Sequence, residues 1–352
     1  MKCMVMAGGT GGHVFPALAV AHALRSQGHD VVWMGAPDSF ESRTVPQHGI
    51  AMEFIHVSGL RGKGVLKLLF APLLLVRALF QALAALRRQR PDVVLGMGGF
   101  AAGPGGIAAW LLRRPLLIHE SNAIAGVTNR WLARVATQAL QAFPGTFTRA
   151  TTVGNPVREA VALLPAPEER LHGRSGPMRV LVIGGSQGAK ALNERVPAAL
   201  KLLPESKRPQ VRHQGGRTLD VAQRAYADSG VPAEVIGFID DMAAAYAWAD
   251  LVICRAGAST VAELAAAGCA ALLVPFPAAV DDHQTRNGEY LVHAGAAQLI
   301  QERELNAQRL ADALTDLLSD RRRLLAMAQA ARKAAWPNAT AAIVQRLLAE
   351  GA

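Results

Sequence analysis

Two glycine-rich strings in this 352-residue sequence have the composition of phosphate-binding loops. GGTGGH occupies residues 8–13 and GGSQGAK occupies residues 184–190, and each lies between a short apolar run and a helix-like segment. Backbone N–H groups of such loops, and the positive end of the following helix, attract phosphate. Neither string is a standard nucleotide motif, because Val14 stands at the third glycine position of the dinucleotide fingerprint and Lys190 follows an alanine. The alternative is a tight strand–helix turn that binds nothing.

His13 ends the first glycine string and is the candidate general base. An imidazole titrates near neutral pH, so it can accept a proton from a reacting hydroxyl group. Its place beside a loop that is expected to face a cleft favours this role. A histidine with a purely structural role is the alternative.

The second glycine string also matches the G-x-S-x-G pattern of a hydrolase nucleophile, with Ser186 at its centre. A serine hydrolase would need an acid and a histidine, for which the chain offers Asp250 or Asp281 and His283 or His293. That chemistry gives no reason for a separate glycine-loop domain with a strong positive charge. In the other interpretation, Ser186 is a phosphate-binding hydroxyl at a helix N-terminus.

A third string, RAGASTVAELAAAG at residues 255–268, follows the strand-like DLVIC. Thr260 and Glu263 have the spacing of a capping box, in which Glu263 would only stabilise the start of its own helix. In the functional interpretation, Glu263 lies at the carboxyl edge of a strand and binds ribose hydroxyls, while the helix N-terminus faces a pyrophosphate. The sequence leaves both interpretations open.

Two acidic strings are weaker candidates for chemistry. The pair at residues 240–241 precedes MAAAYAWAD, which is more typical of a helix N-cap than of a catalytic dyad. DDHQ at residues 281–284 has metal-binding residue types, but no further ligands follow at zinc or helical spacing. We therefore predict no metal there and expect polar contacts to a sugar from His283, Gln284 and Asn287.

The glycine loops need strands before them and helices after them, and the sequence supplies both twice. Short apolar runs predict strands at residues 2–7, 30–35, 91–95, 115–119, 178–183, 234–237, 250–254 and 271–274. Helices are predicted at residues 16–27 and 191–203, and the tail at 305–352 is helical and amphipathic. This repeat of strand, glycine loop and helix, about 175 residues apart, predicts two Rossmann-like domains with parallel sheets that face each other across a cleft.

The predicted domain boundary lies near residue 157. The alternation of strands and helices pauses there, and residues 164–176 are rich in Pro, Glu and Arg. We assign residues 1–157 to a first domain and residues 158–335 to a second. The helix at about 336–352 is expected to pack back onto the first domain.

Positive charge is concentrated in the first half of the chain. The net charge is +10, and residues 1–157 hold 15 Lys and Arg against 6 Asp and Glu. Such a field favours an anionic partner, either a phosphorylated ligand or an acidic membrane surface. A nucleic acid is not expected, because the few aromatic residues are not interleaved with the basic ones. Three cysteines without disulfide or metal spacing fit a reducing cytosol.

The most apolar segment, residues 65–86, is predicted to lie on a membrane rather than to cross one. Lys67, Pro72 and Arg77 interrupt it, and its longest uncharged runs have nine residues, whereas a spanning helix needs about 20. A buried packing helix is the alternative, but basic residues within and after the segment favour contact with an anionic bilayer. The expected membrane-contact residues are Leu68, Phe70, Leu74 and Phe80.

Eight strings together resemble one enzyme family, in the same order along the chain. They are GGTGGHVFPALAVA, SGLRGKG, PDVVLGMGGFAAGPGG, HESNAIAG, GNPVR, GGSQGAKALN, FIDDMAAAYAWADLVICRAGASTVAE and DDHQTRN. In these strings the sequence is similar to the bacterial UDP-N-acetylglucosamine:N-acetylmuramyl-(pentapeptide) pyrophosphoryl-undecaprenol N-acetylglucosamine transferases, the MurG family. The resemblance extends from about residue 3 to residue 295.

The resemblance implies the GT-B architecture, with UDP-GlcNAc bound by the second domain and a lipid-linked acceptor bound by the first. The implied reaction is the inverting β-1,4 transfer of GlcNAc from UDP-GlcNAc to the 4-hydroxyl of MurNAc in lipid I, which makes lipid II for peptidoglycan synthesis. No cofactor and no metal are implied. The enzyme would be peripheral on the cytoplasmic face of the bacterial inner membrane, with anionic lipids and other cell-wall synthesis proteins as further partners.

The resemblance also implies a set of site residues. His13 would be the base, and Glu120 would lie on the acceptor side. Glu263 would hold the ribose, and the backbone at Ile239 would contact uracil. The implied donor-binding residues are Thr10, Gly11, Gly12, Asn122, Arg158, Ser186, Ile239, Ala258, Ser259, Thr260, Val261, Ala262, Glu263 and Gln284. A GT-B transferase with another lipid or sugar acceptor is the nearest alternative. A binding module that senses UDP-sugars without turnover and a hydrolase acting through Ser186 are more distant ones.

Overall fold

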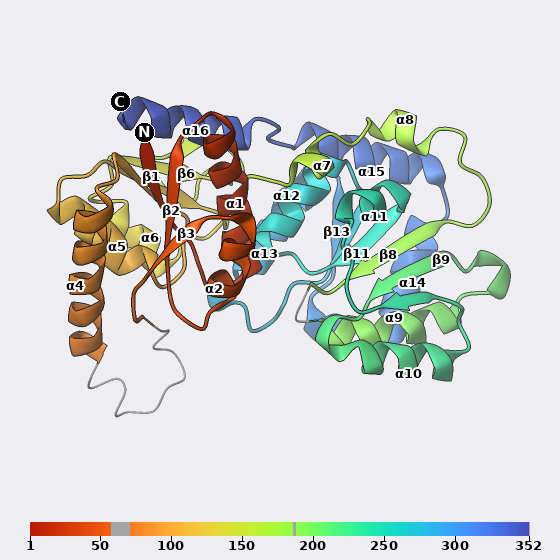
Figure 1. The fold of residues 1–352 in the computed structure, drawn as a ribbon. Coiled ribbons are helices and arrows are strands. Elements are labelled where there is room, and N and C mark those ends of the chain that lie inside the picture. Colours follow the sequence, from red (N-terminus) through yellow and green to blue (C-terminus); the bar gives the residue numbers. More distant parts are fainter. Residues whose placement is uncertain (58–70, 186–187, 352) are drawn as a thin grey trace. The chain divides into compact units, whose positions relative to one another are not determined.

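The computed structural model describes residues 1–57, 71–185 and 188–351 of the chain. The chain divides into two compact units, one made of Met1–Arg158 with Asn338–Ala352 and the other of Glu159–Pro337 (Figure 1). Each unit is built on one parallel sheet with helices around it, so the predicted α/β class with two parallel-sheet domains is confirmed.

The sheet of the first unit has seven parallel strands in the order β3-β2-β1-β4-β5-β6-β7. The strands are β1 (Lys2–Met6), β2 (Asp30–Gly35), β3 (Ala51–Phe54), β4 (Val93–Gly96), β5 (Leu116–Glu120), β6 (Gln138–Gln141) and β7 (Thr151–Thr152). Alternate residues of the central strand β1 serve the two faces of the sheet: Cys3 and Val5 join one core cluster, and Met4 and Met6 join the other. Both faces are apolar because helices cover both.

The helices of the first unit are divided between the two faces of its sheet. They are α1 (Gly11–Ser26), α2 (Phe40–Thr44), α4 (Ala71–Gln89), α5 (Ala102–Leu111), α6 (Val127–Leu132) and α16 (Ala339–Glu350), with a 3-10 turn at Val45–His48. Residues of α1 and α16 share the core cluster of Val5, whereas residues of α4 and α5 share that of Met4. Helix α16 packs against α1 (Figure 1), and its Leu347 is fully buried. The end of the chain therefore supplies part of the first unit's core.

The second unit repeats this plan with six parallel strands in the order β10-β9-β8-β11-β12-β13. The strands are β8 (Arg179–Ile183), β9 (Gln210–Gln214), β10 (Glu234–Ile236), β11 (Leu251–Cys254), β12 (Ala271–Leu273) and β13 (Ala297–Leu299). The helices are α7 (Glu159–Ala162), α8 (Pro167–Leu171), α9 (Lys190–Leu202), α10 (Leu219–Ser229), α11 (Met242–Trp248), α12 (Ala258–Ala267), α13 (His283–His293), α14 (Ala307–Leu317) and α15 (Arg321–Lys333). Its 3-10 turns lie at Glu205–Lys207, Gly216–Thr218, Val280–Asp282 and Glu302–Glu304.

The predicted strands are confirmed to within two residues at each end, and β3, β6, β7, β9 and β13 complete the sheets in the described residues. The predicted start of the first helix is wrong, since α1 begins at Gly11 and not at residue 16. Proline is favoured in the first turn of a helix, where its missing N–H breaks no bond. Here Pro16 lies inside the helix, and burial of α1 residues such as Val14 and Leu18 against the sheet outweighs that local preference.

The segment predicted to lie on a membrane is only partly described. Leu68 and Phe70 lie outside the described residues, whereas Leu74 and Phe80 lie on α4 and are exposed. Within the described parts of the chain, every helix is too short or too polar to cross a membrane.

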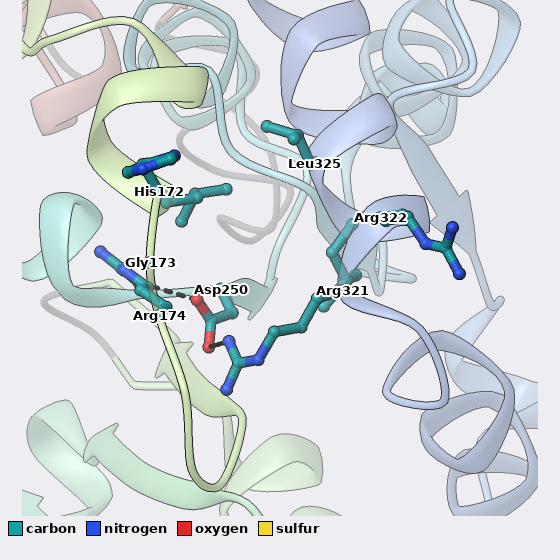
Figure 2. A pocket seen from close by; sticks show the side chains of 9 residues that line it. His172, Gly173, Arg174, Asp250, Arg321, Arg322 and Leu325 are labelled. Carbon is teal, nitrogen blue, oxygen red and sulfur yellow. Dashed lines mark hydrogen bonds and ion pairs between the residues drawn. The ribbon is translucent and has the colours of Figure 1, made fainter.

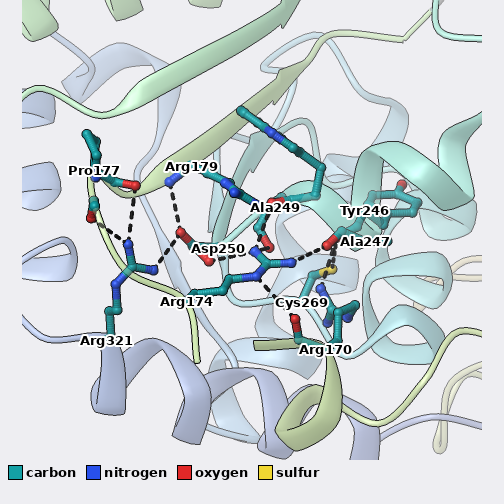
Figure 3. Close-up of polar contacts among 12 residues, drawn as sticks. Arg170, Arg174, Pro177, Arg179, Tyr246, Ala247, Ala249, Asp250, Cys269 and Arg321 are labelled. Carbon is teal, nitrogen blue, oxygen red and sulfur yellow. Dashed lines mark hydrogen bonds and ion pairs between the residues drawn. The ribbon is translucent and has the colours of Figure 1, made fainter. Parts of the chain in front are cut away.

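A cluster of arginines surrounds one carboxylate at the amino ends of β8 and β11 (Figure 3). Asp250 is 5% exposed and accepts hydrogen bonds from the guanidinium groups of Arg174 (2.7 Å) and Arg321 (3.0 Å) and from the backbone N–H of Arg179 (2.9 Å). Arg174 also donates to the carbonyl of Trp248 (2.9 Å), at the end of α11. Removal of one partner from such a buried pair costs about 3–5 kcal/mol, because it leaves a buried charge without compensation. This cluster, called the arginine clamp, ties Arg174 and helix α15 to the amino end of β11.

A pocket of about 260 Å³ lies beside this clamp (Figure 2). It is lined by residues 171–174 on one side and by Arg321, Arg322, Leu324 and Leu325 of α15 on the other, with Asp250 between them. Ligands of open parallel sheets bind at the carboxyl ends of the strands, and this pocket lies at the amino ends. It is therefore a gap in the packing of the chain against α15 and not the candidate site.

Strand β9 carries a buried histidine at the centre of a polar network. His213 Nε2 lies 2.9 Å from Asn193 Oδ1 on α9, and its Nδ1 lies 3.0 Å from the hydroxyl of Tyr226 on α10. The Asn193 amide nitrogen donates to the carbonyls of Gly215 (3.0 Å) and Thr218 (2.9 Å), so its oxygen is the acceptor. His213 Nε2–H therefore donates to Asn193, and the Tyr226 hydroxyl donates to Nδ1. The ring is satisfied in its neutral form, and burial lowers the pKa of His213 to about 3.

We expect the free energy of unfolding to decrease as the pH falls from about 6.5 toward 3. In this range the unfolded histidine gains a proton while the folded His213 does not, so acid favours the unfolded chain. His213→Gln should flatten this pH dependence by up to about 1.4 kcal/mol per pH unit. Urea unfolding at several pH values measures the slope, and substitution of the exposed His172 is the matched control. A variant with the wild-type slope would contradict this account.

Candidate functional site

Each sheet has one switch point, where the strand order reverses. In the first unit β1 lies between β2 and β4, and in the second unit β8 lies between β9 and β11, so the connections on the two sides run in opposite directions. Doubly wound sheets bind ligands at this point, beside the carboxyl ends of the strands. The first glycine string follows β1, and the second follows β8. Both predicted loops therefore lie at switch points.

The loops at the switch point of the first unit touch through their backbones. Gly99 follows β4 with a φ of 90°, and a Cβ there would lie 2.6 Å from the carbonyl oxygen of Gly8. Gly98 has a φ of 98°, and a Cβ there would lie 2.8 Å from Cδ2 of His13. Glycine is required at both positions by the left-handed backbone and by the close approach. The absence of side chains leaves room for the His13 ring.

His13 lies in the first turn of α1, and its ring is half-buried. Its Nδ1 is 3.3 Å from the carbonyl oxygen of Gly8. A carbonyl can only accept a hydrogen bond, so this contact favours the tautomer with the hydrogen on Nδ1, in which Nε2 is the basic nitrogen. Thr10 is the N-cap of α1, and Gly11 and Gly12 open the helix. The structure thus gathers this part of the predicted set at a single helix N-terminus.

Glu120 organises the loop after β5. Its buried carboxylate accepts hydrogen bonds from the backbone N–H groups of Asn122 (2.9 Å) and Gly126 (3.1 Å) and from the side-chain amide of Asn129 (2.9 Å). The side-chain amide of Asn122 also donates to it, at 3.2 Å. Glu120 therefore holds Asn122 in place, and its contact with an acceptor stays a prediction.

His119 is a neutral neighbour of His13. Its Nε2 donates to the carbonyl of Gly154 at 2.9 Å, and its side chain is fully buried. Burial is the largest influence on the pKa of His119 and lowers it. The Gly154 carbonyl and the Glu120 carboxylate raise this pKa by smaller amounts, and the charge of His13 lowers it further. A charged His13 is thus not accompanied by a second imidazolium at this edge of the sheet.

Arg158 lies beside the same helix, although it comes from the end of the first unit's main segment. Its guanidinium carbon is 5.8 Å from the centre of the Phe15 ring on α1, and that ring packs edge-on against Phe40 at 5.8 Å. The structure therefore brings Arg158 next to the helix that carries His13.

The loops at the second switch point also meet through their backbones. Ser186 lies outside the described residues, but Gly188 has a φ of 76°, and a Cβ there would lie 2.6 Å from Oγ1 of Thr218. A Cβ on Gly216 would lie 2.5 Å from the nitrogen of Gly188. The side-chain amide of Asn193, which also binds His213, donates hydrogen bonds to the carbonyls of Gly215 and Thr218. The Asn193–His213 network therefore fixes the turn against which the glycine string packs.

Helix α12 begins at the carboxyl end of β11 with Gly257 as its N-cap. Its first turns hold five predicted donor-site residues: Ala258, Ser259, Thr260, Val261 and Ala262. Thr260 and Glu263 lie inside the helix, so the capping-box interpretation is wrong. Glu263 is buried and accepts a hydrogen bond from the Tyr246 hydroxyl at 3.1 Å. Ile239 is the buried residue of the otherwise largely exposed connection between β10 and α11.

Two side chains of α13 support the neighbouring loops. Gln284 Oε1 accepts the backbone N–H of Phe276 at 2.9 Å, after β12. Asn287 is fully buried and donates to the carbonyl of Ala256 at 3.3 Å, after β11. Asn287 therefore supports this loop, and the prediction that it contacts a sugar is wrong because its side chain is buried. His283 and Gln284 are half-buried at the start of α13.

The acidic candidates are placed apart from one another. Asp241 caps α11 by accepting the N–H of Ala244 at 2.9 Å, which confirms its predicted N-cap role. Asp250 lies in the arginine clamp at the opposite edge of the sheet, so its nomination as a hydrolase acid is wrong. Asp281 and Asp282 are exposed, with φ of 53° and 52°. In residues 1–57, 71–185 and 188–351, no group of His, Cys, Asp and Glu could hold a metal ion.

Sequence reasoning missed two residues near His13. His119 belongs to the string HESNAIAG, but no spacing rule distinguishes it. Glu41 lies on the short helix α2, and its carboxylate accepts the backbone N–H of Gly9 at 3.0 Å. No motif includes Glu41, so only the folded structure reveals it.

The comparisons with known proteins agree with this architecture. Residues 3–141 match the glycosyltransferase family 28 N-terminal domain, and residues 179–343 match the glycosyltransferase family 28 C-terminal domain. The chain is 59% identical over 353 residues to a protein of Marinobacter nauticus named UDP-N-acetylglucosamine–N-acetylmuramyl-(pentapeptide) pyrophosphoryl-undecaprenol N-acetylglucosamine transferase, with 99% of this chain and 97% of that protein covered. A protein of Xylella fastidiosa with the same name is 57% identical over 349 residues, which cover 99% of this chain and 95% of that one.

Among solved structures, the chain is similar to MurG of Acinetobacter baumannii, with a TM-score of 0.86, 43% identity and 99% of both chains covered. The predicted GT-B fold class, with two Rossmann-like domains, is thereby confirmed. The chain belongs to glycosyltransferase family 28 and, within it, to the family of UDP-N-acetylglucosamine–N-acetylmuramyl-(pentapeptide) pyrophosphoryl-undecaprenol N-acetylglucosamine transferases.

Proposed function

We propose that this protein transfers GlcNAc from UDP-GlcNAc to the 4-hydroxyl of the MurNAc sugar of lipid I, making lipid II for peptidoglycan synthesis. The observation that carries the proposal is the 59% identity over 99% of the chain to a transferase of that name. We assign UDP-GlcNAc to the unit of Glu159–Pro337 and lipid I to the unit that contains His13. The concentration of positive charge in residues 1–157 supports an anionic pyrophosphate acceptor there.

The reaction is a direct displacement with inversion. The 4-hydroxyl oxygen of MurNAc attacks the anomeric carbon of GlcNAc from the face opposite UDP, and the carbon–oxygen bond to UDP breaks with its electron pair. The hydroxyl proton passes to Nε2 of His13, whose other nitrogen holds its hydrogen against Gly8. The products are a β-1,4-linked disaccharide lipid, UDP and a protonated His13.

The departing UDP develops negative charge, which fixed dipoles and cations stabilise. In this proposal the N-terminus of α12, the hydroxyl of Ser186 and the guanidinium of Arg158 supply that field. Glu263 binds the ribose and the backbone at Ile239 binds uracil. Two further residues complete the proposed donor site. Gln284 also holds the loop of Phe276, and Asn122 is itself held in place by Glu120.

We place the protein peripherally at the cytoplasmic face of the inner membrane, through one surface of the first unit. Helix α4 packs against α5, and α5 packs against α6. These helices carry exposed apolar side chains, namely Leu73, Leu74, Leu75, Val76, Phe80, Trp110, Leu111, Val127 and Trp131. Arg134 lies 4.3 Å over the ring of Trp131, so cations accompany the apolar surface. An amphipathic, basic surface of this kind binds anionic lipid interfaces.

The assigned reaction is tested by UDP release from UDP-GlcNAc with and without a short-chain lipid I analogue. We expect release only when the analogue is present, together with a disaccharide-lipid product. Equal release without the analogue would mean that another acceptor, or water, takes the sugar.

The base role is tested with His13→Ala. We expect turnover to fall by about 100-fold or more, because the attacking hydroxyl would lose its proton acceptor. UDP-GlcNAc binding, measured by calorimetry, should change little. Near-normal turnover in the variant would remove His13 from this role.

The membrane surface is tested with the double variant Leu74→Glu and Phe80→Glu. Two carboxylates on the exposed face of α4 should abolish co-sedimentation with vesicles that contain anionic lipid, because they oppose both apolar insertion and charge attraction. Leu202→Glu, at a comparably exposed leucine on α9 of the second unit, is the control and should still sediment. Unchanged sedimentation of the double variant would exclude this surface.

A further inference from the structure

Glu41 is a buried carboxylate next to the first glycine loop. It is 2% exposed and lies on the short helix α2. Ser39 and Ser42 cap the start of this helix: the N–H of Ser42 donates to Ser39 Oγ at 3.1 Å, and the N–H of Ser39 donates to Ser42 Oγ at 2.9 Å. Burial of a carboxylate is costly unless hydrogen bonds compensate it. The hydrogen-bond partners of Glu41 therefore indicate which groups this buried carboxylate holds in place.

Those partners are two backbone N–H groups at the carboxyl edge of the sheet. Glu41 Oε2 accepts from Gly9, after β1, at 3.0 Å, and Oε1 accepts from Ala36, after β2, at 3.2 Å. A Cβ at Gly8 would lie 2.4 Å from Oε1, and a Cβ at Gly35 would lie 2.8 Å from Cγ of Glu41. Two glycines thus make the space that the carboxylate fills.

The N–H of Gly9 and the carbonyl of Gly8 belong to one peptide group. Glu41 binds the N–H end of that group, and His13 Nδ1 lies 3.3 Å from its oxygen. The order of groups is carboxylate, peptide N–H, peptide carbonyl, imidazole N–H. Hydrogen bonds that share a peptide group polarise one another, so a negative charge at the N–H end makes the carbonyl a stronger acceptor.

We propose that Glu41 is a positioning residue for the reaction, which acts on His13 through the Gly8–Gly9 peptide group. It holds the hydrogen of His13 on Nδ1 and directs Nε2 toward the acceptor hydroxyl. This inference rests on the proposed role of His13 as the base. A carboxylate that orients a histidine directly is a common arrangement, and here one peptide group stands between the two side chains.

The surroundings of the ring are consistent with a single orientation. The Gly8 carbonyl lies at the Nδ1 edge of the ring, and the backbone of Gly98 lies against the Cδ2–Nε2 edge. His119, on β5, is a titratable neighbour of His13, and burial lowers the pKa of His119, which favours its neutral form. Glu41 binds the N–H end of the peptide group whose carbonyl His13 contacts.

The tautomer of His13 is the first measurement. Nuclear magnetic resonance of protein labelled with ¹⁵N-histidine distinguishes a ring protonated at Nδ1 from one protonated at Nε2, and His13→Gln assigns the signals. We expect the Nδ1–H form in the wild-type protein and a shift toward the Nε2–H form in Glu41→Gln. An Nε2–H ring in the wild type overturns the proposal without depending on the folding of any Glu41 variant.

Kinetics of Glu41→Gln separate positioning from a general loss of structure. We expect kcat to fall about 10-fold with an unchanged KM for UDP-GlcNAc. Gln141→Met, which removes another buried polar side chain of this unit, is the control and should keep the wild-type kcat. A Glu41→Gln protein that folds and keeps kcat within twofold overturns the proposal.

The double variant His13→Ala with Glu41→Gln shows whether Glu41 acts through His13. Without the imidazole, loss of Glu41 should cause no further decrease in turnover. A further 10-fold decrease means that Glu41 acts elsewhere, and the base role of His13 then stands alone. Normal turnover of His13→Ala by itself removes the base role of His13 and, with it, the proposed role of Glu41, whereas the proposed transfer reaction would stand.

Discussion

Contact between backbones at the two switch points is the constraint on which the rest of this structure depends. Gly8 meets Gly99 in one unit and Gly188 meets Gly216 in the other, at distances that admit no Cβ. Within each unit, these contacts bring together loops that are far apart in the sequence. Hydrogen-bonded polar groups lie beside both contacts: the Asn193–His213 network supports Gly215 and Thr218, and the Glu41 carboxylate binds the N–H of Gly9.

The two edges of the second unit's sheet carry different features. The amino edge holds the arginine clamp around Asp250 and the nearby pocket. The carboxyl edge holds helix N-termini and glycine loops, which leave positive dipoles at the surface. The pocket beside Asp250 lies at the amino edge, whereas ligands of doubly wound sheets bind at the carboxyl edge.

Most of the sheet could be predicted from the sequence, because buried parallel strands are continuous apolar runs such as residues 178–183. Strand β9 escaped prediction because its buried His213 and Gln214 are polar, and their burial depends on distant hydrogen-bond partners. The predicted start of α1 was wrong because tertiary packing overrides the local preference of Pro16. The glycine loops and His13 were evident from spacing, but Glu41 was not. A contact made through another residue's backbone leaves no pattern in the sequence.

The packing of α16 against α1 has a consequence for the order in which the protein acquires its structure. Residues 339–350 leave the ribosome only after the entire second unit, yet Ile343, Val344 and Leu347 belong to the core of the first. During synthesis, the face of α1 and β1 that they cover stays open while about 180 further residues are made. The unit that is translated first is therefore completed last, and its apolar face stays exposed to aggregation until α16 is made.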